Sequence, residues 1–232
     1  MDALVVLPTY DEACNLRPLV LQILALEVGV RVCVVDDASP DGTGDIAAAL
    51  AQETGRVHLI RRPAKLGLGT AYCAGLQYGL DSGAERLITM DCDFSHDPAA
   101  IPALIRLTET KDLAIGSRYV KGGGTKNWGL GRRILSRGAN LVARVLLRVP
   151  VRDATAGFRC YRRQVLEAVS PDSIRSEGYS WLEEMIFRVH RAGFSIGEVP
   201  ITFADRRAGE SKICKREIFR AVWTLLRLRC RG

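Results

Sequence analysis

The chain has 232 residues, of which 47% are apolar, and carries a formal net charge of +7. This length and composition can bury a full core, so they favour one large α/β domain with an appendage and argue against a disordered or fibrous chain. No apolar run approaches the roughly 20 residues that cross a bilayer, so no membrane-spanning helix is expected. The apolar run Leu4–Leu7 is too short for a secretion signal because Pro8 ends it, so no such signal is expected.

The charges are distributed unevenly along the chain. Residues 1–205 carry 24 basic and 24 acidic residues, whereas residues 206–232 carry nine basic and two acidic ones. Residues 118–163 hold twelve basic residues against one acid. This asymmetry predicts an anionic partner, which could be phosphate groups, a membrane surface or nucleic acid. The seven cysteines lack paired spacing and lie mostly in apolar segments, so we expect reduced thiols and a location on the cytosolic side.

Strands and helices are predicted to alternate over the first part of the chain. The expected strands are Leu4–Leu7, Arg31–Val35, Val57–Ile60 and Leu87–Met90, and the expected helices are Leu16–Leu24, Ile46–Ala51 and a segment ending near Leu80. Thr43 or Asp41 is expected to cap the second helix. The alternation predicts a mostly parallel, doubly wound sheet with right-handed crossovers.

Polar residues follow these strands. Tyr10 and Glu12 follow the first, Asp37 the second and Asp91 the fourth. Because the carboxyl ends of parallel strands meet at one edge of a sheet, these side chains are expected to converge on one crevice. Asp41 is instead expected to stabilise a turn by accepting hydrogen bonds from nearby backbone amides.

Asp91 and Asp93 lie two residues apart where a buried strand ends. If the chain turns between them, both carboxylates can hold one hard divalent ion such as Mg²⁺ or Mn²⁺. Two acids at this spacing are more often a solvated turn or a helix cap. The pair alone is therefore a weak signal.

Eight segments, taken together and in order, resemble the dolichyl-phosphate (polyprenyl-phosphate) mannose synthases of glycosyltransferase family 2. They are PTYDE, VVDDASPDGT, LGLGTAYCAG, MDCDFSH, GSRYVKGGG, NWGLGRRILSRGAN, DATAGFRCYRR and EVPITFADRRAGESK. The resemblance covers about Leu4 to Lys212. It implies a nucleotide-sugar glycosyltransferase of the GT-A fold that moves mannose from GDP-mannose to a polyprenyl (dolichyl-type) phosphate with inversion.

The resemblance also implies site residues by position. Pro8, Tyr10, Glu12, Val35 and Asp37 correspond to residues that hold the nucleotide base and ribose. Asp91, Cys92, Asp93 and Ser95 correspond to the donor-diphosphate and metal segment, Arg118, Arg132 and Ser136 to the acceptor-phosphate site, and Arg206 and Lys212 to basic residues near the donor phosphates. The chain departs from some relatives at Ser95, where they have an amide, and at Trp181-Leu182-Glu183-Glu184, so the role of Glu184 is left open.

The chemistry suits these residues. A divalent ion on Asp91 and Asp93 would stabilise the charge that develops on the departing diphosphate. A phosphate monoester is already an anion at neutral pH, since its second pKa is about 6, so no general base is required. Cations must instead hold two phosphate groups together, and Arg118, Arg132, Arg206 and Lys212 can supply them. Arg137, Arg162 and Arg163 are expected on the solvated surface.

Two basic amphipathic segments are predicted. In the first, Arg133, Arg137, Arg144 and Arg148 flank an apolar face made of Ile134, Leu135, Leu141, Val142, Val145 and Leu146. The second begins near Lys215, where an apolar face is opposed by Arg216, Arg220, Arg227 and Arg231; the face consists of Ile218, Phe219, Val222, Trp223, Leu225 and Leu226. Such helices suit a membrane interface, but they can also pack on the domain; the two readings weigh equally for the first segment, and the membrane is favoured for the tail. We therefore expect a catalytic domain at 1–212 and an interface helix at 213–232, peripheral on the cytosolic face of an anionic membrane.

Two other functions are considered. The same architecture could use UDP-glucose or another nucleotide sugar, because the nucleotide segments alone do not distinguish the base. A non-catalytic basic module for RNA or membranes would leave Asp91, Asp93, Glu12 and Asp37 without a purpose, and the chain has no recognised RNA-binding motif, so no nucleic-acid partner is expected. A membrane-spanning partner protein and the length of the polyprenol are left open.

Overall fold

A seven-stranded sheet forms the centre of the molecule. The computed structural model describes residues 2–174, 176, 178, 180–205 and 225–229. The strands follow the order β3-β2-β1-β4-β7-β5-β8, with bounds β1 Ala3–Thr9, β2 Val30–Asp36, β3 Val57–Arg61, β4 Arg86–Thr89, β5 Leu113–Ser117, β7 Arg159–Arg162 and β8 Ile196–Pro200. Strand β7 is antiparallel to both its neighbours and every other pairing is parallel. The prediction of a mostly parallel sheet is confirmed.

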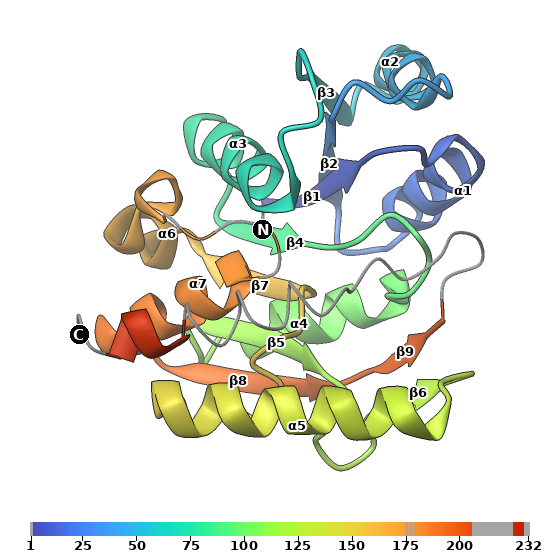
Figure 1. Cartoon of the computed structure of the whole chain (residues 1–232). Coiled ribbons are helices and arrows are strands. Elements are labelled where there is room, and N and C mark those ends of the chain that lie inside the picture. The colour runs from blue at the N-terminus through green and yellow to red at the C-terminus, as the bar shows by residue number, and fades with distance from the viewer. Residues whose placement is uncertain (1, 175, 177, 179, 206–224, 230–232) are drawn as a thin grey trace.

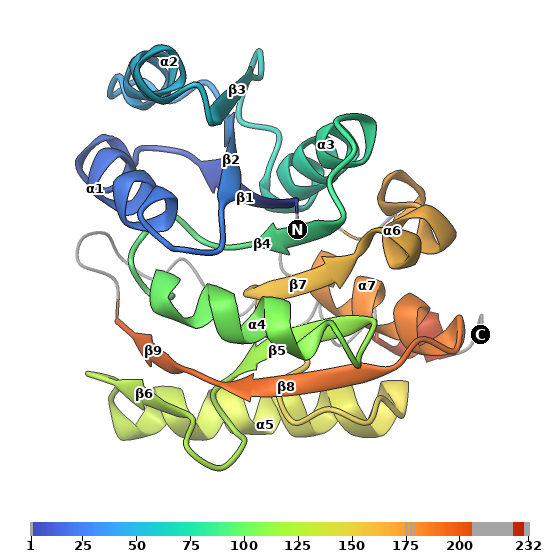
Figure 2. The same cartoon turned by 180° about the vertical axis from the view of Figure 1, so that it is seen from behind.

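Helices cover both faces of the sheet (Figures 1 and 2). Helices α3 (Leu68–Asp81), α6 (Arg163–Val169) and α7 (Ser180–Arg191) pack on one face, and α1 (Ala13–Leu24), α2 (Thr43–Thr54) and α4 (Ile101–Leu107) on the other. Strand β1 shows why two cores form: Leu4 and Val6 point to the first face, while Val5 and Leu7 point to the second. Short 3₁₀ turns occupy Pro98–Ala100 and Pro171–Ser173.

Helix α3 lies very close to the sheet. A Cβ atom at Gly75 would come within 2.2 Å of Val6 Cγ1 and 3.1 Å of Val35 Cγ2. Only a glycine allows this approach without a shift of the helix or the strands. The close packing fixes the loop between β3 and α3 relative to the ends of β1 and β2.

The predicted strands and helices exist, with differences at their ends. Helix α2 begins at Thr43, and its N-cap is Gly42, which has a positive φ of 88° and makes no side-chain cap. The expected cap by Thr43 or Asp41 is therefore wrong. Asp41 instead accepts hydrogen bonds from the amides of Thr43 and Ala13, at 3.0 and 2.9 Å, so it does perform the turn chemistry that was predicted. The five described cysteines are free thiols, although Cys14 is exposed rather than part of the core.

Helix α5 (Leu130–Leu147) lies along one end of the molecule, beside β8 and far from α2 and β3 (Figure 1). Its buried residues are Asn140, Ala143 and Leu147. Five of the six residues of its predicted apolar face are exposed, with Ile134 at 63% and Val145 at 66%. The face is thus mostly turned outward, and only Leu146 of these six residues packs against the core. A two-stranded ribbon, β6 (Gly124–Lys126) with β9 (Thr202–Ala204), lies near its start.

The C-terminal segment is described only at residues 225–229, which are helical. Leu225 is 2% exposed and joins the core on the α7 face, and Leu228 packs against it, while Leu226 is 43% exposed. The expectation that Leu225 and Leu226 share a membrane-facing side is wrong for Leu225. The remainder of the predicted interface helix lies outside the described residues. None of the described helices is long and apolar enough to cross a membrane.

Candidate active site

The carboxyl ends of four mutually parallel strands bring the predicted site residues to one edge of the sheet. Tyr10 follows β1, Asp37 follows β2, Asp91 follows β4 and Arg118 follows β5. Strand β5 runs parallel to β4 because both are antiparallel to β7, which lies between them. The residues expected for the donor and for the acceptor therefore lie along the same edge.

The two acids at the end of β2 hold neighbouring loops in place. Asp36 accepts hydrogen bonds from Thr9 Oγ1 at 3.1 Å and Ser39 Oγ at 2.5 Å. Asp37 is buried, forms an ion pair with Arg62, and accepts a hydrogen bond from the amide of Gly67 at 2.9 Å. Asp37 thus fixes the loop that enters α3. The sequence had indicated Asp37 but not its partner Arg62.

Tyr10 and Glu12 flank the ends of β1 and β2. The ammonium of Lys65 lies 3.4 Å from the centre of the Tyr10 ring, a cation–π contact that the sequence did not indicate. Glu12 Oε2 accepts a hydrogen bond from Asn15 at 2.8 Å. Pro8 is half-buried, whereas Val35 is fully buried beneath α3. The side chain of Val35 is therefore in the core, and a nucleotide contact at this position would have to come from its backbone.

The segment after β4 turns sharply at Phe94, which has a positive φ of 60°. Asp91 is 30% exposed and accepts a hydrogen bond from Tyr72 Oη at 2.9 Å. Asp93 is buried and accepts one from the amide of Ser95 at 3.0 Å. Between the two acids the chain bends at Cys92, and the turn at Phe94 follows both of them.

Residues of this segment also fit a divalent cation. The hydroxyl of Ser95 is buried and makes no hydrogen bond within the described part of the chain. Together with the carboxylates of Asp91 and Asp93 it provides hard oxygen donors of the kind that Mg²⁺ and Mn²⁺ prefer. Among the described residues, no three or more His, Cys, Asp or Glu side chains are grouped to hold a metal, so an ion here would need further oxygens from a substrate diphosphate or from water.

The pKa of the Cys92 thiol is affected by the surrounding carboxylates. Burial, and then the negative charges of Glu12, Asp93 and Asp91, raise the pKa of Cys92 well above its usual range. The thiol is therefore protonated at neutral pH. Glu12 follows β1 and the two aspartates follow β4, so this effect reflects the meeting of the two strand ends.

His96 connects the acidic segment with the basic one, and sequence reasoning missed it. Its Nδ1 accepts a hydrogen bond from the amide of Asp91 at 3.2 Å. Its ring stacks on Phe158 at 5.0 Å and meets Phe203 edge-on at 5.2 Å. Burial lowers the pKa of His96 in spite of the nearby acids, so the ring is neutral. The only signal in the sequence was its place three residues after Asp93.

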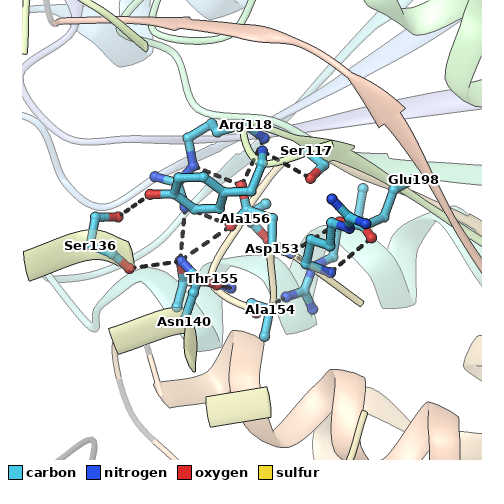
Figure 3. Close-up of polar contacts among 12 residues, drawn as sticks. Ser117, Arg118, Ser136, Asn140, Asp153, Ala154, Thr155, Ala156 and Glu198 are labelled. Atoms are coloured by element: carbon cyan, nitrogen blue, oxygen red, sulfur yellow. Dashed lines mark hydrogen bonds and ion pairs between the residues drawn. The ribbon is translucent and has the colours of Figure 1, made fainter. Parts of the chain in front are cut away.

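Arg118 is held by a buried carboxylate, as Figure 3 shows. Its Nε and Nη2 donate to the two oxygens of Asp153 at 2.8 and 2.7 Å, and Nη2 also donates to Thr155 Oγ1 at 2.8 Å. Burial lowers the pKa of Arg118, but the hydrogen bond and charge of Asp153 outweigh it and raise the pKa overall. The guanidinium is therefore charged and fixed, with Nη1 not engaged by these bonds.

Further hydrogen bonds support Asp153 and Thr155 (Figure 3). Glu198 of β8 accepts from the amides of Arg152 and Asp153 at 2.8 and 3.0 Å. Asn140 of α5 accepts from the amide of Thr155 at 3.2 Å and donates to its hydroxyl at 3.0 Å. The loop that carries Asp153 is thus fixed from both the sheet and α5.

Trp128 lies between the two arginines that were assigned to an acceptor phosphate. The guanidinium carbon of Arg132 is 4.1 Å from the centre of the Trp128 ring, and that of Arg118 is 5.6 Å from it. Arg132 also pairs with Asp205 at 2.7 Å. Ser136 accepts a hydrogen bond from Tyr119 Oη at 2.8 Å. The structure therefore brings Arg118, Arg132 and Ser136 together, through partners that the sequence did not reveal.

Two other predicted residues, Arg206 and Lys212, lie outside the described residues. Glu184, whose role was left open, is buried, pairs with Arg188 at 2.5 Å and accepts a hydrogen bond from the amide of Ser176 at 3.1 Å. These contacts tie α7 to the segment before it, so Glu184 has a structural role here.

Known proteins resemble the chain in sequence and in structure. The profile of Glycosyl transferase family 2 matches residues 4–170. An undecaprenyl-phosphate mannosyltransferase from Micrococcus luteus is 45% identical over 228 residues, which cover 98% of this chain and 93% of the relative. A polyprenol monophosphomannose synthase from Mycolicibacterium smegmatis is 43% identical over 231 residues, which cover 99% of this chain and 87% of the relative.

Among solved structures, glucosyl-3-phosphoglycerate synthase from Mycobacterium tuberculosis resembles the chain. Its complex with Mn²⁺, uridine diphosphate and glucosyl-3-phosphoglycerate has a TM-score of 0.69 at 20% identity, covering 99% of this chain and 80% of that one. Its complex with Mg²⁺ and uridine diphosphate has a TM-score of 0.68 at 18% identity, covering 99% and 79%. At such identities the likeness shows a common fold.

Proposed function

Because the chain belongs to glycosyl transferase family 2, we propose that it transfers mannose from GDP-mannose to a polyprenyl phosphate and so forms polyprenyl-phosphate mannose. The chain is a glycosyltransferase of the GT-A fold. The names of the two relatives, which match it over nearly their whole length, support the sugar and the lipid. The observation that carries the proposal is the position of Arg118 and Arg132 around Trp128, at the same sheet edge as Asp91.

Asp91, Asp93 and Ser95 would hold Mg²⁺ or Mn²⁺ together with the diphosphate of the donor. The bound ion would neutralise the charge that develops as the nucleoside diphosphate leaves. Support for a divalent ion comes from the donor set and from the Mn²⁺ and Mg²⁺ present in the complexes of the M. tuberculosis synthase. The protein orients this segment through the bond from Tyr72 to Asp91 and the turn at Phe94.

The acceptor phosphate would lie against Arg118 and Arg132. It needs no general base, because a phosphate monoester is an anion at neutral pH. Arg118 can donate through Nη1 while Asp153 keeps the guanidinium in place. At Arg132 the phosphate can take the position of Asp205, because this ion pair is partly exposed to solvent. Charge attraction then holds an anionic nucleophile close to an anionic donor.

Action at a membrane surface follows from the lipid acceptor. A polyprenyl phosphate lies in the bilayer with its phosphate at the surface, so the enzyme has to reach the interface. Helix α5 carries Ser136 on its inner side and exposes Ile134, Leu135 and Val145 on its outer side. We infer that the chain acts as a peripheral protein, with α5 lying in the plane of the cytosolic membrane surface.

A donor screen tests the proposal. Purified protein is incubated with a short, water-soluble polyprenyl phosphate and with GDP-mannose, UDP-glucose or UDP-galactose in turn. The mass of the lipid product is then determined by mass spectrometry. One hexose should be added from GDP-mannose and little from the uridine donors. Transfer from UDP-glucose alone would replace the donor in the proposal, and no transfer to any polyprenyl phosphate would refute it.

A further inference from the structure

A second anion site is suggested by a pocket on the flank of α5. The cavity has a volume of about 520 Å³ and lies between α5 and the loop after β5. Its lining residues include Arg118, Tyr119, Arg137, Asn140, Arg144 and Arg152. We call this cavity the α5 pocket.

Three arginines of the α5 pocket have no anionic partner among the residues that the structure describes. The side chains of Arg137, Arg144 and Arg152 make no hydrogen bond or ion pair within the described part of the chain, whereas Arg118 is paired with Asp153. The nearby carboxylate of Glu198 is already used, since it accepts bonds from two backbone amides. Three unpaired guanidinium groups around one cavity repel each other, and a bound anion with several oxygens would remove that repulsion.

The pocket is separate from the proposed acceptor site. With 3.6 residues per helical turn, Arg137 and Arg144 lie about a third of a turn around α5 from Arg132. Ser136 and Asn140 lie between the two flanks and point to Tyr119 and Thr155 (Figure 3). Only Arg118 contributes to both places, so a ligand in the pocket would not occupy the space beside Trp128.

Exposed apolar residues next to the pocket indicate the kind of ligand. Leu141 lines the pocket and is 58% exposed, and it continues into the outward face formed by Ile134 and Val145. A free phosphate would use only the arginines. A phospholipid would use both features, with its phosphate in the pocket and its acyl chains along the apolar face. Charge complementarity and this continuity favour an anionic lipid.

We propose that the α5 pocket binds the phosphate of an anionic phospholipid headgroup and so anchors α5 beside the acceptor site. This inference rests on the proposed action at a membrane but not on the identity of the sugar or of its donor. The phospholipid is a second lipid, distinct from the polyprenyl phosphate that accepts the sugar. It positions the enzyme and takes no part in the transfer.

Vesicle binding with matched variants tests the proposal. Arg144→Gln/Arg152→Gln removes two charges from the pocket, and Arg133→Gln/Arg148→Gln removes two exposed charges from α5 and its C-terminal end, outside the lining. Affinity is measured for phosphatidylcholine vesicles with and without added phosphatidylglycerol. The pocket variant should lose at least ~10-fold more of the phosphatidylglycerol-dependent affinity than the control, because its hydrogen bonds add to the general attraction. An equal loss in both variants would overturn the proposal.

Two further measurements separate the sources of the anion. Short-chain phosphatidylglycerol and inorganic phosphate are each titrated calorimetrically into the wild type and the pocket variant, and only the lipid should bind, with binding lost in the variant. Equal binding of free phosphate would reduce the site to a general anion site. Transfer to a water-soluble polyprenyl phosphate should be unchanged in the pocket variant, and an increase in the KM of that acceptor would instead make the pocket its phosphate site. A wild type that bound these vesicles but transferred no sugar would refute the proposed function alone.

Discussion

Arg118 and Asp153 form a buried ion pair in which two nitrogens of the guanidinium meet two oxygens of the carboxylate, at 2.8 and 2.7 Å. The Asp153 side chain is fully buried and that of Arg118 is 9% exposed. Removing either side chain would leave the other charge buried without a counter-charge. A substitution of Arg118 is therefore expected to change the stability of the protein as well as any contact with a substrate. Arg132, whose ion pair is partly exposed, can be changed with less disturbance.

Removing one partner of the buried pair should be costly. Asp153→Asn leaves the Arg118 guanidinium buried without a counter-charge, and it should lower the free energy of unfolding by about 3–5 kcal/mol. Arg118→Gln should have a similar effect through Asp153. Urea unfolding of both variants and of the double variant measures the coupling, because the double variant should lose less than the sum of the two. Additive losses would show that the pair is not coupled.

Arg132→Gln should weaken the use of the acceptor far more than the binding of the donor. The acceptor kcat/KM should fall at least ~10-fold, since a charged hydrogen bond contributes about 1.5–3 kcal/mol, while the Kd of GDP-mannose measured by calorimetry should be nearly unchanged. Asp205→Asn is the matched variant, because it removes the carboxylate that competes with the phosphate for Arg132. It should lower the acceptor KM, and an increase would show that Asp205 does not compete.

The metal segment gives a third prediction. Asp91→Asn and Asp93→Asn should each reduce turnover by at least ~10²-fold if the metal contributes several kcal/mol to the transition state. Calorimetric titration of Mn²⁺ in the presence of GDP should show weaker binding in both variants. Asp97→Asn serves as the control, because Asp97 accepts a hydrogen bond from the amide of Ala99 at the start of the next turn and lies outside the segment. Full activity of the wild type in excess chelator would remove the metal from the mechanism.

The stability of the protein should depend on pH through Glu183. Burial, partly offset by the charge of Arg159, raises the pKa of Glu183 to about 7 from an ordinary value of 4.5. The folded state therefore holds this proton more tightly than the unfolded state, and the contribution to stability is fully present below about pH 4.5 and is lost as the pH rises through 7.

Glu183→Gln removes this dependence. Relative to the wild type, the variant should gain up to roughly 3 kcal/mol of stability between about pH 5 and about pH 8. Denaturant unfolding at the two pH values measures the gain. The control is Glu167→Gln, which changes a more exposed carboxylate paired with Arg163. The same pH dependence in wild type and Glu183→Gln would mean that another group titrates.

The sequence predicted those parts of the fold that are determined by local patterns of apolar and polar residues. Apolar runs closed by polar residues located β1, β2 and β4, and the parallel alternation placed Tyr10, Asp37 and Asp91 at one edge. The amphipathic pattern of α5 was also correct, but it could not tell whether Ile134 and Val145 would face the domain or the outside. The orientation of this face depends on whether another part of the chain covers it. Helix α5 lies beside the edge strand β8 at one end of the molecule.

Contacts between distant segments were not predictable in the same way. Arg118 and Asp153 are 35 residues apart, and Arg132 and Asp205 are 73 residues apart. No local period indicates which acid will meet which base, because the pairing is fixed by the whole sheet. Leu225 shows the same limit: its apolar spacing matched that of Leu226, yet one is in the core and the other is exposed.

With the proposed assignment of Arg132 to the acceptor, the ion pair between Arg132 and Asp205 would couple the binding of the two substrates. Asp205 immediately precedes Arg206, which is expected near the donor phosphates, so the pair joins an acceptor residue to the beginning of a donor segment. If the acceptor phosphate replaces Asp205 at Arg132, the free energy of breaking this ion pair would contribute to the binding of the acceptor and to the binding of the donor. Thermodynamic linkage then requires that donor and acceptor change each other's affinity by the same factor, so this one pair would set how cooperatively the two substrates bind.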